Sequence, residues 1–173
     1  MRRLSATLLA LIAVATAALA GPATGGAATA KKPVATPSLL WATVNVCDTT
    51  DHPDTIGIRG SMPGSGVRAQ EMYMRFQLQY LAADDQKWHN IGTSGDSGWI
   101  DVGSAKYRAR QTGRNFTVRP PASGSFTLRG AVTFEWRKGT DVVRRARMRT
   151  SAKRGNTAGA DPRGFSAAVC EVK

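Results

Sequence analysis

The sequence is poor in the residues that most often carry chemistry. Its 173 residues contain two cysteines, two histidines and twelve acidic side chains, against twenty-four lysines and arginines. The motifs HExxH, GxxxxGK[ST] and GxGxxG, which supply zinc ligands and phosphate-binding loops, do not occur. No cofactor is therefore expected. The excess of basic over acidic side chains instead favours a protein with an affinity for anions.

The first 20 residues have the pattern of an export signal. Arg2 and Arg3 precede an uncharged apolar run, and the small-x-small sequence Ala18–Ala20 follows it. The run is shorter than the roughly 20 residues of a membrane anchor, which is the alternative interpretation. We expect residues 1–20 to be a signal peptide and the mature protein to be secreted, without a membrane span. The abundance of Arg, Ala and Gly, which GC-rich codons encode, indicates a bacterial source.

Residues 21–38 contain mainly Ala, Gly, Thr and Pro and cannot bury a core, so we expect a flexible, disordered linker. Residues 39–173 have the length of one domain. Cys47 and Cys170 lie near the two ends of this domain. An even number of cysteines in an exported chain predicts a disulfide bond between them, and the absence of a CxxC motif argues against a redox pair.

Apolar and polar residues alternate with a period of two through residues 39–173, and no long helical pattern occurs. The clearest strands are 71–81, EMYMRFQLQYL, and 126–137, FTLRGAVTFEWR. Shorter strands are expected at 39–47, 55–61, 87–92, 99–103, 115–120, 142–150 and 165–172. Turn-forming clusters separate them. Short strands with frequent turns predict an all-β fold, a single antiparallel β-sandwich.

Two segments resemble a known family. MRFQLQYLAADDQKWHNIG, residues 74–92, resembles the C–C′ hairpin of fibronectin type III and related immunoglobulin-like domains. NFTVRPPASGSFTLRGAVTFEWRKG, residues 115–139, resembles their E–F corner, with Phe126 at the place of the corner tyrosine. The resemblance covers about residues 41–150 and implies an immunoglobulin-like sandwich. The whole chain is also similar to uncharacterised secreted actinobacterial proteins, and a shared sandwich implies no activity.

The segment 126–154 is strongly basic, and its acidic residues are Glu135 and Asp141. We expect 126–150 to form one hairpin with a three-residue loop, 139–141. Pairing Phe134 with Ala146 and Val132 with Met148 buries the apolar side of both strands. The predicted core residues are Phe126, Leu128, Val132, Phe134, Ala146 and Met148. A slip by one residue would bury arginines at high cost.

The same register turns a row of arginines to solvent and places Glu135 opposite Arg145. If the strands C, F and G are neighbours, as in immunoglobulin-like domains, strand 71–81 adds Tyr73, Arg75, Gln77 and Gln79 to this face. The predicted anion-binding face comprises Arg75, Arg129, Arg137, Arg145, Arg147 and Arg149. Arg144 has the opposite parity, and we expect its guanidinium on the indole of Trp136.

Two interpretations of this face stay open. It is either a solvated surface that keeps the protein soluble and blocks edge pairing, or a binding surface. A binding surface would suit an anionic cell-envelope polymer or an extracellular protein. Nucleic acid is not favoured, because Tyr73 is the only aromatic residue assigned to the face. The protein is thus expected to be a non-catalytic secreted binding module whose partner the sequence does not identify.

The alternative function is a small secreted enzyme with a site around Asp51, His52 and His89. The segment CDTTDHPD, residues 47–54, fits no defined calcium loop and has the composition of a turn, so no metal site is predicted. His89 has no partner close in the sequence. The string GDSG, residues 95–98, resembles a serine-protease motif, but the rest of that pattern is missing and we expect a turn. No catalytic residue is therefore assigned.

Overall fold

The computed structural model describes residues 39–152 and 157–173, and the predicted signal peptide and linker lie outside the described residues. The described residues form β-strands and short 3-10 turns, among them Thr93–Gly95, without an α-helix. The strands are β1 Trp41–Cys47, β2 Thr55–Pro63, β3 Glu71–Leu81, β4 Trp88–Asn90, β5 Asp96–Ser104, β6 Ala109–Thr117, β7 Phe126–Lys138, β8 Asp141–Arg149 and β9 Cys170–Val172. The all-β prediction is confirmed.

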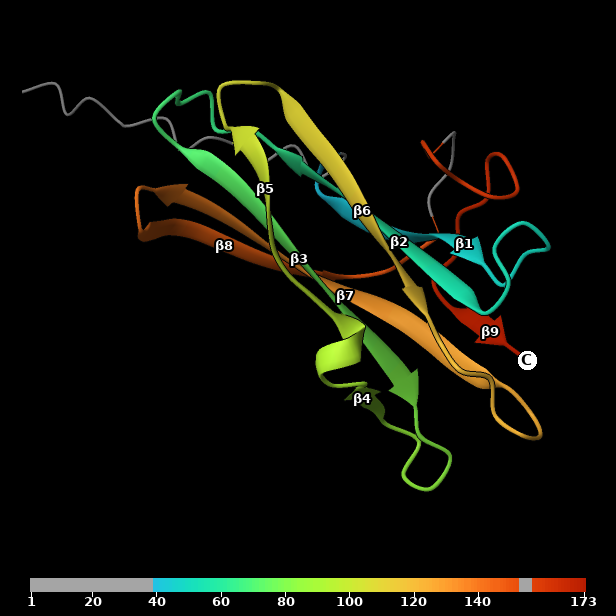
Figure 1. Cartoon of the computed structure of the whole chain (residues 1–173). Coiled ribbons are helices and arrows are strands. Elements are labelled where there is room, and N and C mark those ends of the chain that lie inside the picture. Colours follow the sequence, from blue (N-terminus) through green and yellow to red (C-terminus); the bar gives the residue numbers. More distant parts are fainter. Residues whose placement is uncertain (1–38, 153–156) are drawn as a thin grey trace, which may run out of the picture. The chain divides into compact units, whose positions relative to one another are not determined.

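The strands form two antiparallel sheets that pack face to face (Figure 1). One sheet has the order β1-β2-β6. The other has the order β4-β3-β7-β8. β5 also pairs with β3, over the part of β3 that precedes its pairing with β4, and β9 pairs with the start of β7. As predicted, the strands that carry the six arginines of the predicted face, β3, β7 and β8, are neighbours in one sheet.

The core lies between the two sheets and is built from the residues that alternate inward. Ile56, Ile58 and Met62 of β2 meet the long inward row of β3 and β7. That row comprises Met72, Met74, Phe76, Leu78, Leu128, Val132, Phe134 and Trp136, all buried. Burial of apolar side chains in both layers is the main stabilising contribution to such a fold.

Several predicted strand ends differ from the observed ones. β6 begins at Ala109, six residues before the predicted start, because it is held by backbone pairing with β2 while most of its side chains face solvent. β9 covers three residues of the predicted strand 165–172. The predicted turn at 95–98 is wrong after Gly95, because Asp96, Ser97 and Gly98 belong to β5. Ser97 and Gly98 form a bulge opposite Phe76 of β3, whose amide donates to Ser97 Oγ.

The β7–β8 hairpin has the predicted register. Phe134 pairs with Ala146, Val132 with Met148 and Glu135 with Arg145. The loop has two residues instead of three: Lys138 pairs with Asp141, and Gly139 has φ of 59°, as the first loop residue of a type II′ turn has. The third residue that the predicted register requires lies in β8 itself. Val142 pairs with Arg137 and Arg144 pairs with Trp136, which leaves Val143 unpaired in a bulge.

The predicted core is correct except at Phe126. Leu128, Val132 and Phe134 are buried, and Ala146 and Met148 are half-buried against the core. Phe126 is 37% exposed at the first position of β7, where it pairs with the buried Val172 of β9. Its side chain lines a surface crevice at that end of the domain.

The predicted disulfide is present. Cys47 at the end of β1 and Cys170 at the start of β9 are bonded, with Cα atoms 5.4 Å apart. The bond links the two sheets across 123 residues of sequence, since β1 belongs to one sheet and β9 to the other. It therefore closes a loop that contains almost every described strand.

Candidate functional site

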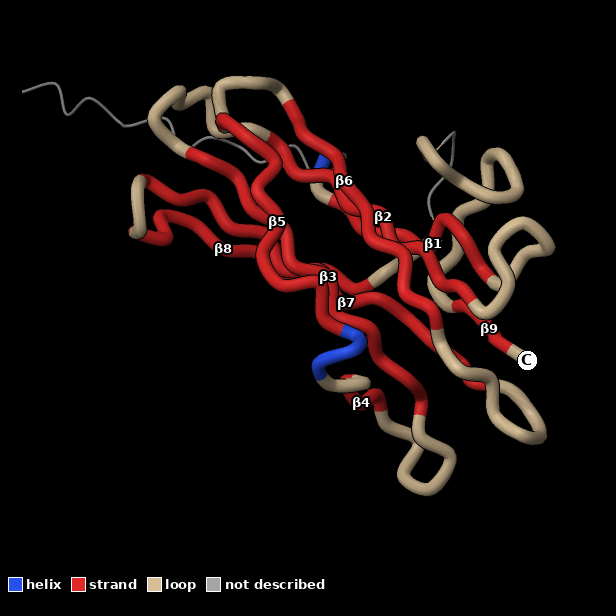
Figure 2. The backbone as a smooth tube through the Cα atoms, in the orientation of Figure 1, coloured by secondary structure: helices blue, strands red, loops and turns tan. Residues whose placement is uncertain are grey.

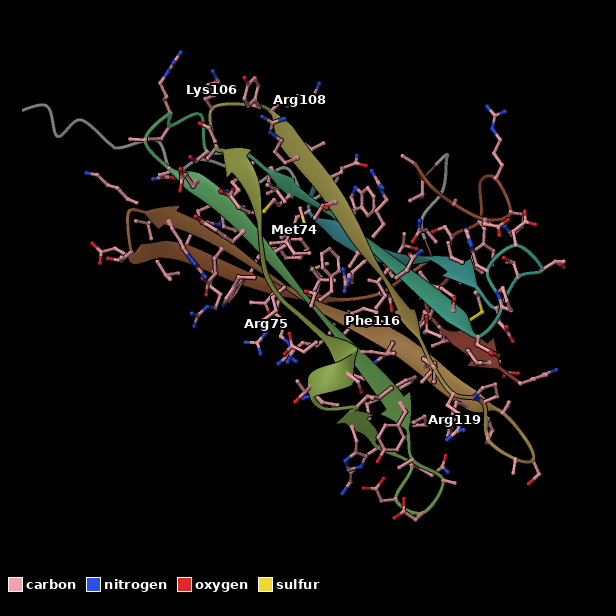
Figure 3. All side chains as sticks on the ribbon, viewed as in Figure 1. Met74, Arg75, Lys106, Arg108, Phe116 and Arg119 are labelled. Carbon is pink, nitrogen blue, oxygen red and sulfur yellow. A yellow bond between two sulfur atoms is a disulfide. The ribbon has the colours of Figure 1, made fainter. Side chains whose placement is uncertain are left out.

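The six predicted arginines lie on the outer face of the larger sheet. Residues that alternate with the core row point to this face, as Figure 3 shows for Arg75 next to the inward-pointing Met74. Cross-strand pairing aligns Tyr73 with Glu135 and Arg145, and Arg75 with Thr133 and Arg147. The structure thus brings together the residues predicted from strand parity.

Three of these arginines are neutralised by carboxylates. Arg75 Nε donates to Asp96 Oδ1 at 2.8 Å, and its Nη2 also contacts Oδ2. Hydrogen bonds from Arg75 hold the pKa of Asp96 below its usual range. Glu135 accepts from Arg137 Nε at 2.7 Å and from Arg145 Nε at 2.6 Å. These three arginines serve structure on this face and are not free to bind an anion.

Glu135 is more deeply buried than its outward direction suggests. Its side chain is 1% exposed, because Arg137 and Arg145 cover it from two sides. Burial alone would raise the pKa of Glu135, but the two guanidinium groups outweigh burial and lower it. Glu135 thus lies opposite Arg145 as the predicted register requires, but its carboxylate is buried and not exposed to solvent.

The other three arginines have no carboxylate partner within the described segments. Arg129, Arg147 and Arg149 line a hollow of about 480 Å³ together with Gln79, Trp88, Ala131 and Met148. We call this hollow the arginine pocket. Arg147 and Arg149 are exposed, whereas Arg129 is half-buried at its base. Burial and then the charges of Arg149 and Arg147 lower the pKa of Arg129, so the three cations repel one another.

Arg129 is held in place from two directions. Its guanidinium carbon lies 4.0 Å from the centre of the Trp88 ring, a cation–π contact. Its Nε donates to Gln79 Oε1 at 2.9 Å, and Gln79 Nε2 donates in turn to Asn90 Oδ1 at 2.9 Å. These contacts use Nε and one planar face of the Arg129 guanidinium. Its two terminal nitrogens have no hydrogen-bond partner in the described structure and remain for a ligand.

Sequence reasoning missed two aromatic residues of this face. β4 places Trp88 opposite Leu81, and β5 places Trp99 opposite Arg75. Both tryptophans lie in predicted strands, but nothing in the sequence shows that these strands both flank β3. The statement that Tyr73 is the only aromatic residue of the face is thus wrong. Arg137 covers Tyr73 and Trp99, at 4.2 and 4.6 Å from their ring centres. Arg144 lies 4.4 Å from Trp136, as predicted.

The residues of the alternative enzyme site do not come together. Asp51 and His52 lie in the loop between β1 and β2, and His89 lies in β4 of the other sheet (Figure 1). Contrary to the expectation, His89 has a partner four residues away: its Nε2 lies 2.9 Å from Asp85 Oδ2. No hydrogen bond joins His89 to the β1–β2 loop in the described residues.

The acidic segment 47–54 forms a turn, as predicted. Asp48 Oδ1 accepts from the amide of Asp54 at 2.8 Å, and both residues have positive φ. Asp48 Oδ2 accepts from the amide of Lys173. Within residues 39–152 and 157–173, no group of three or more His, Cys, Asp or Glu side chains is placed to hold a metal ion. No helix of these residues is long and apolar enough to span a membrane.

The fold and the face define an all-β, disulfide-bonded sandwich with an unneutralised arginine pocket on its larger sheet. Comparison with protein-family models, with curated proteins and with solved structures finds no match. Any functional conclusion must therefore come from the chemistry of the site.

Proposed function

We propose that this protein is a secreted, non-catalytic module that binds an anionic polymer of the cell envelope through the arginine pocket. The observation that carries the proposal is that only three of the six arginines have a carboxylate partner. Carboxylates neutralise Arg75, Arg137 and Arg145, whereas Arg129, Arg147 and Arg149 gather around one hollow without an acidic partner in the described structure.

A general solubility surface does not need this arrangement. Exposed arginines that only solvate a sheet gain nothing from clustering, because like charges repel. Here burial, and then repulsion by Arg149 and Arg147, lowers the pKa of Arg129. A bound phosphate, sulfate or carboxylate group would relieve the repulsion. Arginine donates in a planar fork that fits such groups with two parallel hydrogen bonds. The stacking of Arg129 on Trp88 fixes its fork before a ligand arrives, which reduces the entropy lost on binding.

An envelope polymer fits the surroundings of the pocket better than nucleic acid. Sequence-tolerant binding of single strands uses bare aromatic faces for base stacking. On this sheet, guanidinium groups already lie over Trp88, Tyr73 and Trp99. The export pattern of residues 1–20 and the disulfide are consistent with a location outside the cytoplasm. There, anionic wall polymers are the abundant polyanions.

The domain belongs, in this proposal, to the immunoglobulin-like sandwiches. Those domains place strands A, B and E in one sheet and C, F and G in the other. The orders β1-β2-β6 and β4-β3-β7-β8 support the correspondence. β9 is an addition to that pattern, paired with the start of β7.

The proposal is tested by binding of the protein to immobilised heparin and to an anionic wall polymer. The variant Arg147→Ser/Arg149→Ser removes two exposed side chains and should weaken binding at least about tenfold, with steep salt dependence in the wild type. Arg129→Lys keeps the charge but loses the fork, and should also weaken binding. The control Arg114→Ser/Arg163→Ser removes the same charge elsewhere. If it weakens binding equally, net charge rather than the pocket is responsible and the proposal is wrong.

A further inference from the structure

A second basic surface lies at the end of the domain where β2 leads to β3 and β5 leads to β6 (Figures 1 and 2). We call the segments 64–70 and 105–110 the loop end. Backbone hydrogen bonds join its two parts: Gly64 N donates to Arg108 O at 3.0 Å, Gly66 N to Ala105 O at 2.9 Å, and Ala105 N to Gln70 O at 2.7 Å. At Gly64 the chains approach so closely that a Cβ atom would lie 1.8 Å from Tyr107 O. The two loops therefore form one fixed platform.

The loop end carries cations without carboxylates. Arg68, Lys106 and Arg108 are exposed, and Figure 3 shows Lys106 and Arg108 on the loop that follows β5. Segments 64–70 and 105–110 contain no acidic residue, and no ion pair involves their cations in the described structure. Arg110 is half-buried, and its Nε is buried without a hydrogen-bond partner. The two segments thus supply no carboxylate to offset their own positive charge.

Two large apolar side chains are exposed among these cations. Val67 is 45% exposed on one loop and Tyr107 is 46% exposed on the other. The ring of Tyr107 is held between Lys106 Nζ, 4.7 Å from its centre, and the Arg110 guanidinium carbon, 4.1 Å from it. A surface that bound only a hydrophilic polyanion would need the cations and not the exposed valine.

We propose that the loop end docks on the surface of an anionic lipid bilayer. Tyrosine is favoured at the level of lipid headgroups because its ring is apolar and its hydroxyl is polar. Lys and Arg beside it interact with lipid phosphates, and Val67 would enter the outer acyl boundary. The surface lies before β3 begins, whereas the arginine pocket lies beside Gln79 and Trp88 at the other end of β3. Docking and polymer binding therefore use separate residues, and this inference does not depend on the proposed function.

The test uses hydrogen exchange of the full-length chain with vesicles of equal parts phosphatidylglycerol and phosphatidylcholine, and with phosphatidylcholine alone. Anionic vesicles should slow the exchange of amides in 64–70 and 105–110. This readout is local to the loop end and is separate from any vesicle contact of residues 1–38. Protection that is absent, or equal with neutral vesicles, overturns the proposal.

Variants separate lipid docking from attraction of any polyanion. Val67→Ser/Tyr107→Ser keeps all charges. It should raise the vesicle concentration needed for half-maximal protection of the loop end about tenfold, because docking scales with buried apolar area. Val67→Ser alone should show a smaller loss without disturbing Tyr107. The charge control Arg114→Ser/Arg163→Ser removes two exposed cations outside the loop end and the arginine pocket, and its loop end should be protected as in the wild type. Two results would show that the loop end is a polyanion site and not a lipid site. One is that vesicles protect the loop end of Val67→Ser/Tyr107→Ser as strongly as that of the wild type. The other is that soluble heparin protects the wild-type loop end as strongly as anionic vesicles do.

Discussion

Phe134 lies directly across the β7–β8 ladder from Ala146, although the loop between the two strands has only two residues. A regular hairpin on that loop would pair Phe134 with Arg145, since Lys138 pairs with Asp141. The bulge near Val143 supplies the one extra residue that turns Ala146 inward and Arg145 outward. The position of the arginine pocket therefore depends on one unpaired residue of β8.

Deletion of Val143 should be tolerated, because Arg144 would then follow Val142 in regular pairing and every later pair would be kept. We expect the free energy of unfolding to change by about 1 kcal/mol or less. Deletion of Ala146 cannot be absorbed in this way, because Arg145 or Arg147 must then face Phe134 in the core. It should cost more than about 3 kcal/mol. Urea denaturation of both variants measures the difference, and equal losses would mean that the bulge itself stabilises the hairpin.

The two phenylalanines of β7 should differ strongly in their contributions to stability. Phe134 is completely buried between the sheets, and Phe134→Ala should cost about 3–5 kcal/mol. Phe126 is 37% exposed at the strand end, and Phe126→Ala should cost about 1 kcal/mol. Denaturant unfolding of the two variants tests this contrast. A loss at Phe126 as large as that at Phe134 would show that the crevice at this end is closed in solution.

Strand parity was enough to predict which arginines share a face, and it was not enough to predict which of them are free. Parity is local, so alternation in 71–81 and 126–137 directly indicated the outward residues. The partners of Arg75 and Arg129 lie in β5 and β4, whose places beside β3 depend on long-range pairing. Asp96 was assigned to a turn because Gly and Ser surround it, and only its backbone pairing makes it a strand residue and a partner of Arg75. The prediction for Phe126 is wrong because alternation shows which side of a strand a residue takes and not how fully that side is covered.

Gly130 of β7 leaves no room for a side chain, because Ile58 of the other sheet packs directly against it. A Cβ atom there would lie 2.7 Å from Ile58 Cδ1 and 2.9 Å from Thr150 Cγ2. Gly130→Ala should therefore destabilise the protein by about 1–3 kcal/mol through overpacking. At Gly60 the nearest atoms, Met74 Sδ and a ring carbon of Phe134, are 3.3 Å from a Cβ, and the Met74 side chain can adjust. Gly60→Ala should cost less, and thermal unfolding that ranks the two in the reverse order contradicts this account of the packing.

Glu135 should make the stability of the protein fall in acid. Its pKa is lowered in the folded state because Arg137 and Arg145 hydrogen-bond to the carboxylate. A lowered pKa adds stability that is fully present above the ordinary value of 4.5 and is lost as the pH falls through the folded-state pKa. Glu135→Gln keeps the size of the side chain but removes its charge, and should cost about 1–2 kcal/mol at pH 7.

The unfolding free energies of wild type and Glu135→Gln should converge as the carboxylate of the wild type becomes protonated, since both side chains are then neutral. Urea denaturation from pH 7 down to about pH 2 measures the difference in unfolding free energy between wild type and Glu135→Gln at each pH. The difference should shrink steadily below about pH 4.5, the ordinary carboxyl range. A difference that stays constant across the range would assign the effect to packing of the side chain under Arg137 and Arg145 and not to its charge.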